Sequence, residues 1–162
     1  MCTQTLGSPE WQLLSHASAL RGVRALCMIR RLDHIAIAVP DIEAAIQRFS
    51  EDLGIELAGR EDVPTQSTTT AFLPISGTQI ELIHPMGGKG PVQGFLDKRG
   101  GGLHHLCFET DDIDADMQRL VDKGYRFLSD APQPGAHGTR VVFIHPKSAG
   151  GVLIELAEYP KT

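Results

Sequence analysis

The sequence predicts an α+β protein built from two tandem βαβββ modules. Three observations lead to this prediction: an internal repeat, a strand followed by a helix at the start of each copy, and hairpin signals in the remainder of each copy. We expect a first module at about 31–85, a glycine-rich linker at 86–101 and a second module at about 102–158, all within one domain that spans 31–160.

The internal repeat runs without a gap at an offset of 105 − 34 = 71 residues. It aligns "RLDHIAIAVPDIEAAIQRF" (31–49) with "GLHHLCFETDDIDADMQRL" (102–120), so that His34 corresponds to His105 and Asp41 corresponds to Asp112. A match of this length indicates a duplicated supersecondary unit, and we expect the two copies to fold in the same way.

Each copy is expected to open with a strand that leads into a helix. Ile35, Ile37 and Val39 alternate with small or polar residues, as on a half-buried strand. Asp41 and Asp112 follow the two predicted strands and are favourable helix N-cap residues. The pattern therefore predicts one helix directly after each opening strand.

The remainder of each copy has the pattern of strands joined by turns. "TTTAFLPI" and "TQIELIHP" are separated by Ser76-Gly77, which is a hairpin signal. In the second copy "TRVVFIHP" precedes "GVLIELAEY". Within the linker, "VQGFLDK" predicts a short helix.

The composition is that of an ordinary globular protein, with 41% hydrophobic and 22% charged residues among 162. A formal net charge of −5 disfavours nucleic acid as a partner, because such binding requires a basic surface. No apolar run approaches the roughly 20 residues of a membrane-spanning helix, so we expect no membrane partner. Three cysteines without CxxC spacing fit a reducing compartment, which predicts a cytoplasmic location.

Residues 1–30 differ from the rest because they carry one acidic residue and three arginines. Three interpretations stay open: a flexible tail, an extension upstream of a natural start at Met28, or an organelle presequence, which would place the protein in the mitochondrial matrix. We favour the start at Met28, because "MIRRLDHIAIAV" begins a folded domain without any linker.

Strand periodicity places four ionisable residues on one face of the predicted sheet. His34 lies opposite the isoleucine stripe that should pack on the helix, and the same parity selects His105 over His104 in the second copy. Glu81 and Glu155 also lie opposite their apolar neighbours, at matching places of the two copies. Imidazole and carboxylate ligands suit divalent cobalt, nickel, manganese, zinc or iron, so this set predicts a catalytic metal site with open positions.

Several segments resemble the vicinal oxygen chelate superfamily and, within it, the methylmalonyl-CoA epimerase family. They are "LDHIAIAVPDIEAA", "IELIHP", "PVQGFLDKRGGGLHHLCFETDDI", "GAHGTRVVFIHPKS" and "GVLIEL", which together span nearly all of 31–158. The resemblance implies that the two modules form one curved, mostly antiparallel, eight-stranded sheet around a metal-containing cavity. It also implies one divalent ion per chain, with Co²⁺ preferred and Mn²⁺, Ni²⁺ or Zn²⁺ as alternatives, an acyl-CoA substrate and a homodimer. It places the metal ligands at His34, Glu81, His105 and Glu155.

The activity that the resemblance implies is interconversion of the (R) and (S) forms of methylmalonyl-CoA, as in propionate metabolism. Epimerisation removes the α-proton from one face and returns a proton to the other, and a carboxylate is an adequate base once the developing charge is stabilised. Glu155 and Glu81 are the predicted bases. Some family members carry a further catalytic glutamate at a position near Thr70, where this chain has none. The candidate substrate contacts are Lys147, His137, Gln66 and Thr70.

The sequence leaves three alternative functions open. A glyoxalase I-type lyase shares the four-ligand set, but the "HPKS" and "GAHG" segments argue against it. An extradiol-type dioxygenase needs two histidines and one carboxylate, so Glu81 would be a surplus ligand. A non-catalytic binding protein of this fold commonly lacks one or more ligands, whereas all four are present here.

Overall fold

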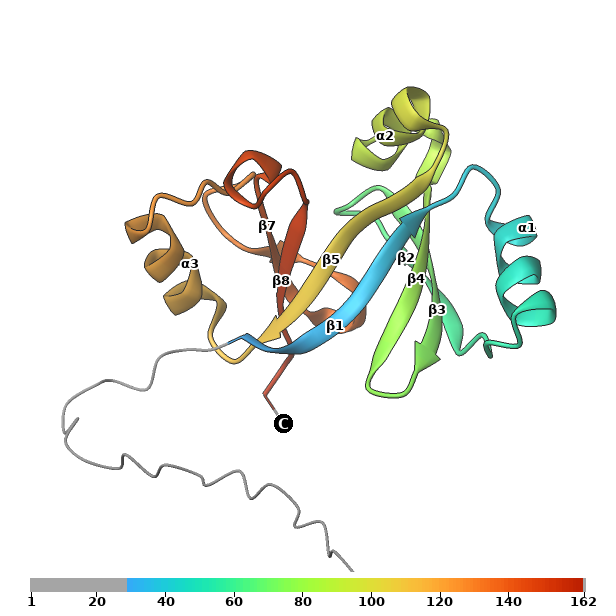
Figure 1. Cartoon of the computed structure of the whole chain (residues 1–162), viewed down its shortest axis with the longest axis horizontal. Coiled ribbons are helices and arrows are strands. Elements are labelled where there is room, and N and C mark those ends of the chain that lie inside the picture. The colour runs from blue at the N-terminus through green and yellow to red at the C-terminus, as the bar shows by residue number, and fades with distance from the viewer. Residues whose placement is uncertain (1–28, 162) are drawn as a thin grey trace, which may run out of the picture.

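The computed structural model describes residues 29–161 of the chain (Figure 1). The predicted leader therefore lies outside the described residues, except for Ile29 and Arg30. These two residues begin the first strand, β1 (Ile29–Ala38), two residues before the expected boundary at 31. Within the range 29–161, no helix is both long and apolar enough to cross a membrane.

The strands of this range form a single eight-stranded sheet, as predicted. The order across the sheet is β2-β3-β4-β1-β5-β8-β7-β6. The pairs β1–β4 and β5–β8 are parallel and the other neighbouring pairs are antiparallel, which confirms the mostly antiparallel sheet. After β1, the strands are β2 (Gly59–Val63), β3 (Thr68–Ile75), β4 (Thr78–Pro85), β5 (Gly102–Thr110), β6 (Gln133–Pro134), β7 (Arg140–Ile144) and β8 (Ile154–Glu158).

The two modules meet at the centre of the sheet, where β1 pairs with β5. Figure 1 shows the sheet curling away from this pair, with the helices α1 and α3 on its two outer sides. The helices are α1 (Ile42–Gln47), which continues into the π-helical turn η1 (Arg48–Asp52), α2 (Pro91–Arg99) and α3 (Ile113–Asp122). Three short 3₁₀ turns complete the fold: η2 (Met86–Gly88), η3 (Ala136–Gly138) and η4 (Pro146–Ser148).

Both predicted helix N-caps are present. The Asp41 carboxylate accepts a hydrogen bond from the backbone N–H of Ala44, and the Asp112 carboxylate accepts one from Ala115, each at 3.0 Å. Each cap satisfies an N–H group in the first turn that has no partner within the helix. The short helix predicted in the linker is confirmed as α2.

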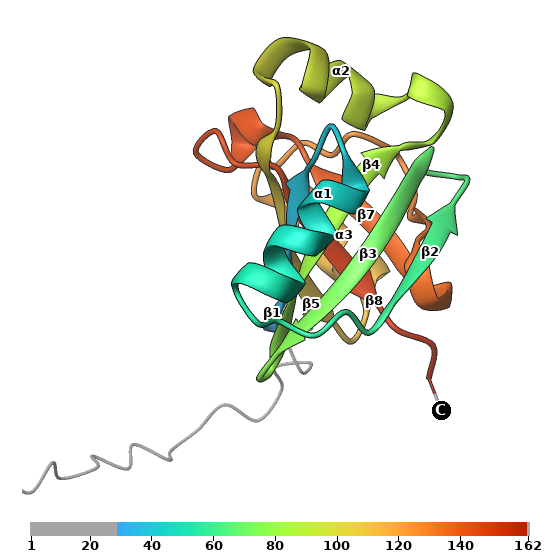
Figure 2. The same ribbon diagram turned by 90° about the vertical axis from the view of Figure 1, so that its right-hand side faces the viewer.

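Two hydrophobic clusters lie between the sheet and its outer helices, α1 and α3. Leu82 on β4 packs with α1, Leu156 on β8 packs with α3, and both are fully buried. In contrast, α2 packs on Ala36 and Ala38, at the end of β1. Figure 2 shows α2 lying across this end of the sheet. The start of α2 therefore lines the cavity on the concave face, and the clusters that contain Leu82 and Leu156 pack on the opposite face of the sheet.

Asp116 on α3 should be a major source of stability. Its fully buried carboxylate accepts hydrogen bonds from Thr110 and Arg119. We expect Asp116→Ala to lower the free energy of unfolding by about 3 kcal/mol, because the substitution leaves buried polar groups without partners. Asp114→Ala on the same helix removes only the exposed ion pair with Arg140 and should cost less than about 1 kcal/mol. Urea unfolding followed by circular dichroism measures both, and equal effects would contradict this prediction.

Candidate metal and substrate site

The four predicted ligands come from the four central strands of the sheet. His34 is on β1, Glu81 on β4, His105 on β5 and Glu155 on β8. All four side chains are buried on the concave face. The four side chains therefore share one face of the sheet, as strand parity predicts, although they lie far apart in the sequence.

Three of the four form a tight cluster. Nε2 of His105 lies 2.7 Å from Oε2 of Glu155, and Nε2 of His34 lies 3.2 Å from the same oxygen. The two Nε2 atoms are 3.2 Å apart. Both imidazoles thus direct the same ring nitrogen towards one carboxylate, which is the arrangement of groups that share an ion or a proton.

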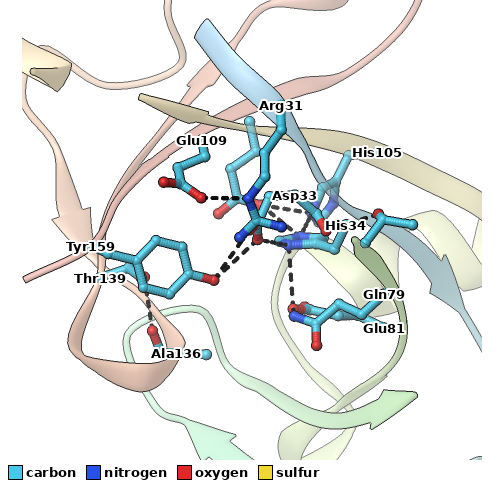
Figure 3. A network of polar contacts seen from close by, with 12 residues as sticks. Arg31, Asp33, His34, Gln79, Glu81, His105, Glu109, Ala136, Thr139 and Tyr159 are labelled. Atoms are coloured by element: carbon cyan, nitrogen blue, oxygen red, sulfur yellow. Dashed lines mark hydrogen bonds and ion pairs between the residues drawn. The ribbon is translucent and has the colours of Figure 1, made fainter. Parts of the chain in front are cut away.

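Glu81 lies beside this cluster but on the other side of the His34 ring. Its Oε1 is 3.3 Å from Nδ1 of His34 and accepts a hydrogen bond of 3.0 Å from Gln79 (Figure 3). Two groups of mutually close ligand atoms occur among the described residues: His34 with His105 and Glu155, and His34 with Asp33 and Cys107. Neither group includes Glu81. The role of Glu81 as a fourth ligand therefore stays a prediction.

Asp33 is a buried part of the site that the sequence analysis missed. Its Oδ2 lies 3.0 Å from Nδ1 of His34, and its carboxylate also contacts Arg31 at 2.9 Å. Tyr159 donates its phenolic hydrogen to the same carboxylate at 3.2 Å (Figure 3). A carboxylate that accepts from Nδ1 keeps the proton on that nitrogen, so Nε2 of His34 is free to act as a ligand.

An irregularity in the β1–β5 ladder explains why Asp33 was missed. Asp33 has no partner in the register, and the same is true of His104 on β5, at the equivalent place of the second module. These local shifts turn both residues towards the cavity, next to the histidines that follow them. The expectation that His104 faces away from His105 was therefore wrong: the two rings touch, with their Nδ1 atoms 2.8 Å apart.

The environments of the two glutamates shift their pKa values in opposite directions. Burial alone would raise the pKa of Glu155, but the charge and hydrogen bonds of His105 and His34 outweigh burial and lower the pKa to about 2. Burial raises the pKa of Glu81 to about 7, helped by the charges of Glu155 and Asp33 and opposed by that of His34. In the metal-free protein Glu155 is thus ionised, whereas Glu81 titrates near neutral pH.

The donor set fits a divalent cation. The ligand atoms of His34, His105 and Glu155 all lie within 4.8 Å of one another. Asp33 is paired with Arg31, whereas the buried carboxyl groups of Glu81 and Glu155 contact the two imidazoles and the Gln79 amide, and buried negative charge is costly without a counter-charge. A divalent cation would supply that counter-charge, and mixed imidazole and carboxylate ligands are typical of catalytic metal sites.

The cluster lines a cavity of about 280 Å³ on the concave face. Three of the predicted substrate contacts, Gln66, Thr70 and His137, also line this cavity. Lys147 does not; it is exposed on η4. The structure therefore gathers the metal ligands with three of the four candidate contacts and leaves the lysine outside.

This fold and this site define a known class of proteins. Residues 33–143 match the family model described as the Glyoxalase/Bleomycin resistance protein/Dioxygenase superfamily, and the chain belongs to this superfamily.

Its relatives within the superfamily narrow the assignment. The ethylmalonyl-CoA/methylmalonyl-CoA epimerase of Cereibacter sphaeroides is 47% identical over 133 residues, which cover 81% of this chain and 99% of the relative. The mitochondrial methylmalonyl-CoA epimerase of Homo sapiens is 43% identical over 129 residues, which cover 79% and 73%. The crystal structure of methylmalonyl-CoA epimerase from Mycobacterium tuberculosis is 38% identical, with a TM-score of 0.79 over 87% of this chain and 95% of that one. The chain is a member of the methylmalonyl-CoA epimerase family.

Proposed function

We propose that the protein interconverts the (R) and (S) forms of methylmalonyl-CoA by removing the α-proton and returning a proton to the opposite face of the resulting enolate. The observation that carries this proposal is the buried cluster of His34, His105 and Glu155 in the cavity of a chain from this family. One similar structure is that of a methylmalonyl-CoA epimerase in complex with methylmalonyl-CoA and NH₄⁺, at 36% identity and a TM-score of 0.77 over 82% of this chain and 96% of that one.

The chemistry requires that negative charge be stabilised where it develops, on the thioester oxygen. A divalent cation held by His34, His105, Glu155 and Glu81 would act as a Lewis acid there. The chain itself supplies a base, and Glu155 is suited to this role because its carboxylate is ionised and lies in the cavity. Glu81 is also predicted from the sequence to act as a base, and Glu81→Gln tests this role.

Finer features of the proposal follow from the ligand set and the family. We propose one divalent ion per chain, with Co²⁺ as the first choice and Mn²⁺, Ni²⁺ or Zn²⁺ as alternatives. A homodimer, a role in propionate metabolism, and a CoA phosphate contact by Lys147 belong to the same proposal. The cytoplasmic location remains a prediction.

The comparisons favour the epimerase over the glyoxalase I-type lyase. The probable lactoylglutathione lyase of Synechocystis is 30% identical over 115 residues, well below the 47% identity of the Cereibacter sphaeroides epimerase. The lyase alternative is therefore not proposed.

Exchange of the α-proton tests the proposed function directly. We expect the cobalt-loaded protein to accelerate loss of the α-proton signal of methylmalonyl-CoA in deuterium oxide, as followed by proton NMR. Chelation should reduce the rate to that of the spontaneous reaction, because the developing charge then has no counter-ion. Exchange no faster than the protein-free control would refute the epimerase proposal.

A further inference from the structure

One ionisable side chain in the wall of the cavity lies apart from the ligand cluster. Among the described residues, every other ionisable side chain that lines the cavity contacts His34 or His105, or, in the case of Tyr159, contacts Asp33 beside His34. The exception is His137, which belongs to η3, between β6 and β7. It is also half exposed, because it lines a neighbouring cleft as well.

His137 belongs to the second module but contacts strands β2 and β3 of the first module. Its ring packs on Phe72 of β3, with ring centroids 4.3 Å apart. Its backbone N–H donates a hydrogen bond of 3.0 Å to Oε2 of Glu61 on β2, and its Nδ1 lies 3.3 Å from the same oxygen. Thr65 adds a second link between the flanks, since its hydroxyl donates to the carbonyl of Pro134 at 2.8 Å. These contacts join the two ends of the curved sheet across the cavity.

The backbone of this loop is specialised for this placement. His137 has a φ of 54°, in the left-handed region that non-glycine residues rarely adopt. A side chain at the preceding Gly135 would approach the Thr139 hydroxyl to 2.6 Å. The sequence "GAHG" thus supports a strained loop, and strain of this kind is concentrated at functional sites.

Apart from His137, no described residue on the β2 and β3 side of the cavity wall carries an ionisable group. β2 and β3 contribute Val63, Thr68 and Thr70 to the wall. Glu61 pairs with Thr70 in the β2–β3 register, and its carboxylate is occupied by His137. Glu155, in contrast, belongs to β8 of the second module. Inversion at the α-carbon needs acid–base groups on two faces, and on the side of β2 and β3 the candidate is His137.

We propose that His137, held in place by Glu61, is the second acid–base residue of the epimerase and acts on the face of the α-carbon opposite Glu155. This inference rests on the proposed function. It leaves Glu81 with the role of a ligand.

The proton transfers balance between the two residues. In one direction, the ionised carboxylate of Glu155 takes the α-proton, and the electrons of the broken C–H bond enter the enolate. Nε2 of the His137 imidazolium then gives its proton to the other face, which leaves neutral His137 and a protonated Glu155. This form of the pair serves the reverse direction, in which Nε2 of His137 takes the α-proton and Glu155 gives up its proton and becomes a carboxylate again.

Glu61 is a positioning residue in this scheme. With its oxygen 3.3 Å from Nδ1, Glu61 favours the proton on that nitrogen, so Nε2 is left to receive the substrate proton. The contact with Phe72 fixes the tilt of the ring.

The test follows each epimer separately in deuterium oxide with His137→Asn, because asparagine tolerates the left-handed backbone but is not a base. We expect inversion to fall by about a hundredfold or more in both directions. One epimer, whose α-proton faces Glu155, should still exchange that proton for deuterium without inversion. The other epimer should lose both exchange and inversion. His84→Gln, a substitution outside the cavity, is the matched control and should behave like the wild type.

The outcomes separate this inference from the proposed function. Wild-type protein that exchanges neither epimer would refute the proposed function and this inference together. An active wild type with a His137→Asn variant that inverts within threefold of normal, or that loses exchange of both epimers equally, would refute the inference alone.

Glu61→Gln tests the positioning role. We expect kcat for inversion to fall by about tenfold, while KM for the thioester stays the same, because the glutamine misdirects the His137 ring without altering the cavity wall. The double variant His137→Asn, Glu61→Gln should be no slower than His137→Asn alone, since both changes remove one function. Additive losses in the double variant would refute the positioning role.

Discussion

Replacing His105 with alanine is expected to abolish stoichiometric metal binding and to slow epimerisation by about a thousandfold or more. The expected size corresponds to the loss of about 4 kcal/mol of transition-state stabilisation, which is the scale of a Lewis acid at a developing oxyanion. His105 and His34 direct their Nε2 atoms to the same Glu155 oxygen, so removal of one imidazole leaves the donor set incomplete. Metal content by mass spectrometry and the inversion rate are measured on the same sample.

His104→Ala is the matched control for this variant. His104 is adjacent in sequence, lines the cavity and contacts His105, but its Nδ1 faces the His105 ring rather than the cluster of Nε2 atoms. We expect the His104 variant to keep its metal and to lose at most about ten- to a hundredfold in rate, as is usual when a neighbour of a ligand is removed. Metal retained by His105→Ala and lost by His104→Ala would reverse the assignment of the two histidines.

The second large effect is expected from Glu155→Gln. A glutamine amide oxygen can still face the metal, but it cannot accept a proton, so inversion should fall by about a hundred- to ten-thousandfold while metal remains bound. Glu81→Gln should cost less than about tenfold, because the side chain is expected to act through its oxygen as a ligand. The inversion rate and the metal content of both variants provide the measurement.

The two glutamate variants also decide between Glu81 and His137 as the second base. If Glu81→Gln shows exchange of one epimer without inversion, Glu81 is the base, as first predicted from the sequence, and the role of His137 is refuted. If both glutamate variants retain near-normal turnover with metal bound, the assignment of Glu155 as base is wrong as well.

The features that the sequence predicted well are those that depend on local chemistry or on the repeat. The caps Asp41 and Asp112, the hairpin turn at Ser76-Gly77 and the helix in the linker each follow from a few neighbouring residues. The pairing of His34 with His105 follows from the constant offset together with strand parity. These signals suffice because the sheet is curved around one cavity, so residues of equal parity on central strands converge.

The features that were missed depend on departures from regular geometry or on long-range contacts. Strict alternation directs Asp33 and His104 away from the cavity, and only the shifts in the β1–β5 register reveal that they face it. Tyr159 reaches Asp33 from beyond the end of β8, a contact without any periodic signal. The link between Glu61 and His137 spans 76 residues, and neither residue belongs to the repeat.

Because the modules each contribute one histidine and one glutamate to the site, an ion bound by these groups would act as a cross-link between the two halves of the chain. His34 and Glu81 belong to the first half, and His105 and Glu155 belong to the second. Metal binding would then couple the folding of the two halves, because separating or unfolding either half releases the ion and loses the free energy of binding. Duplication has produced two halves that are alike in fold but neither of which holds a complete site.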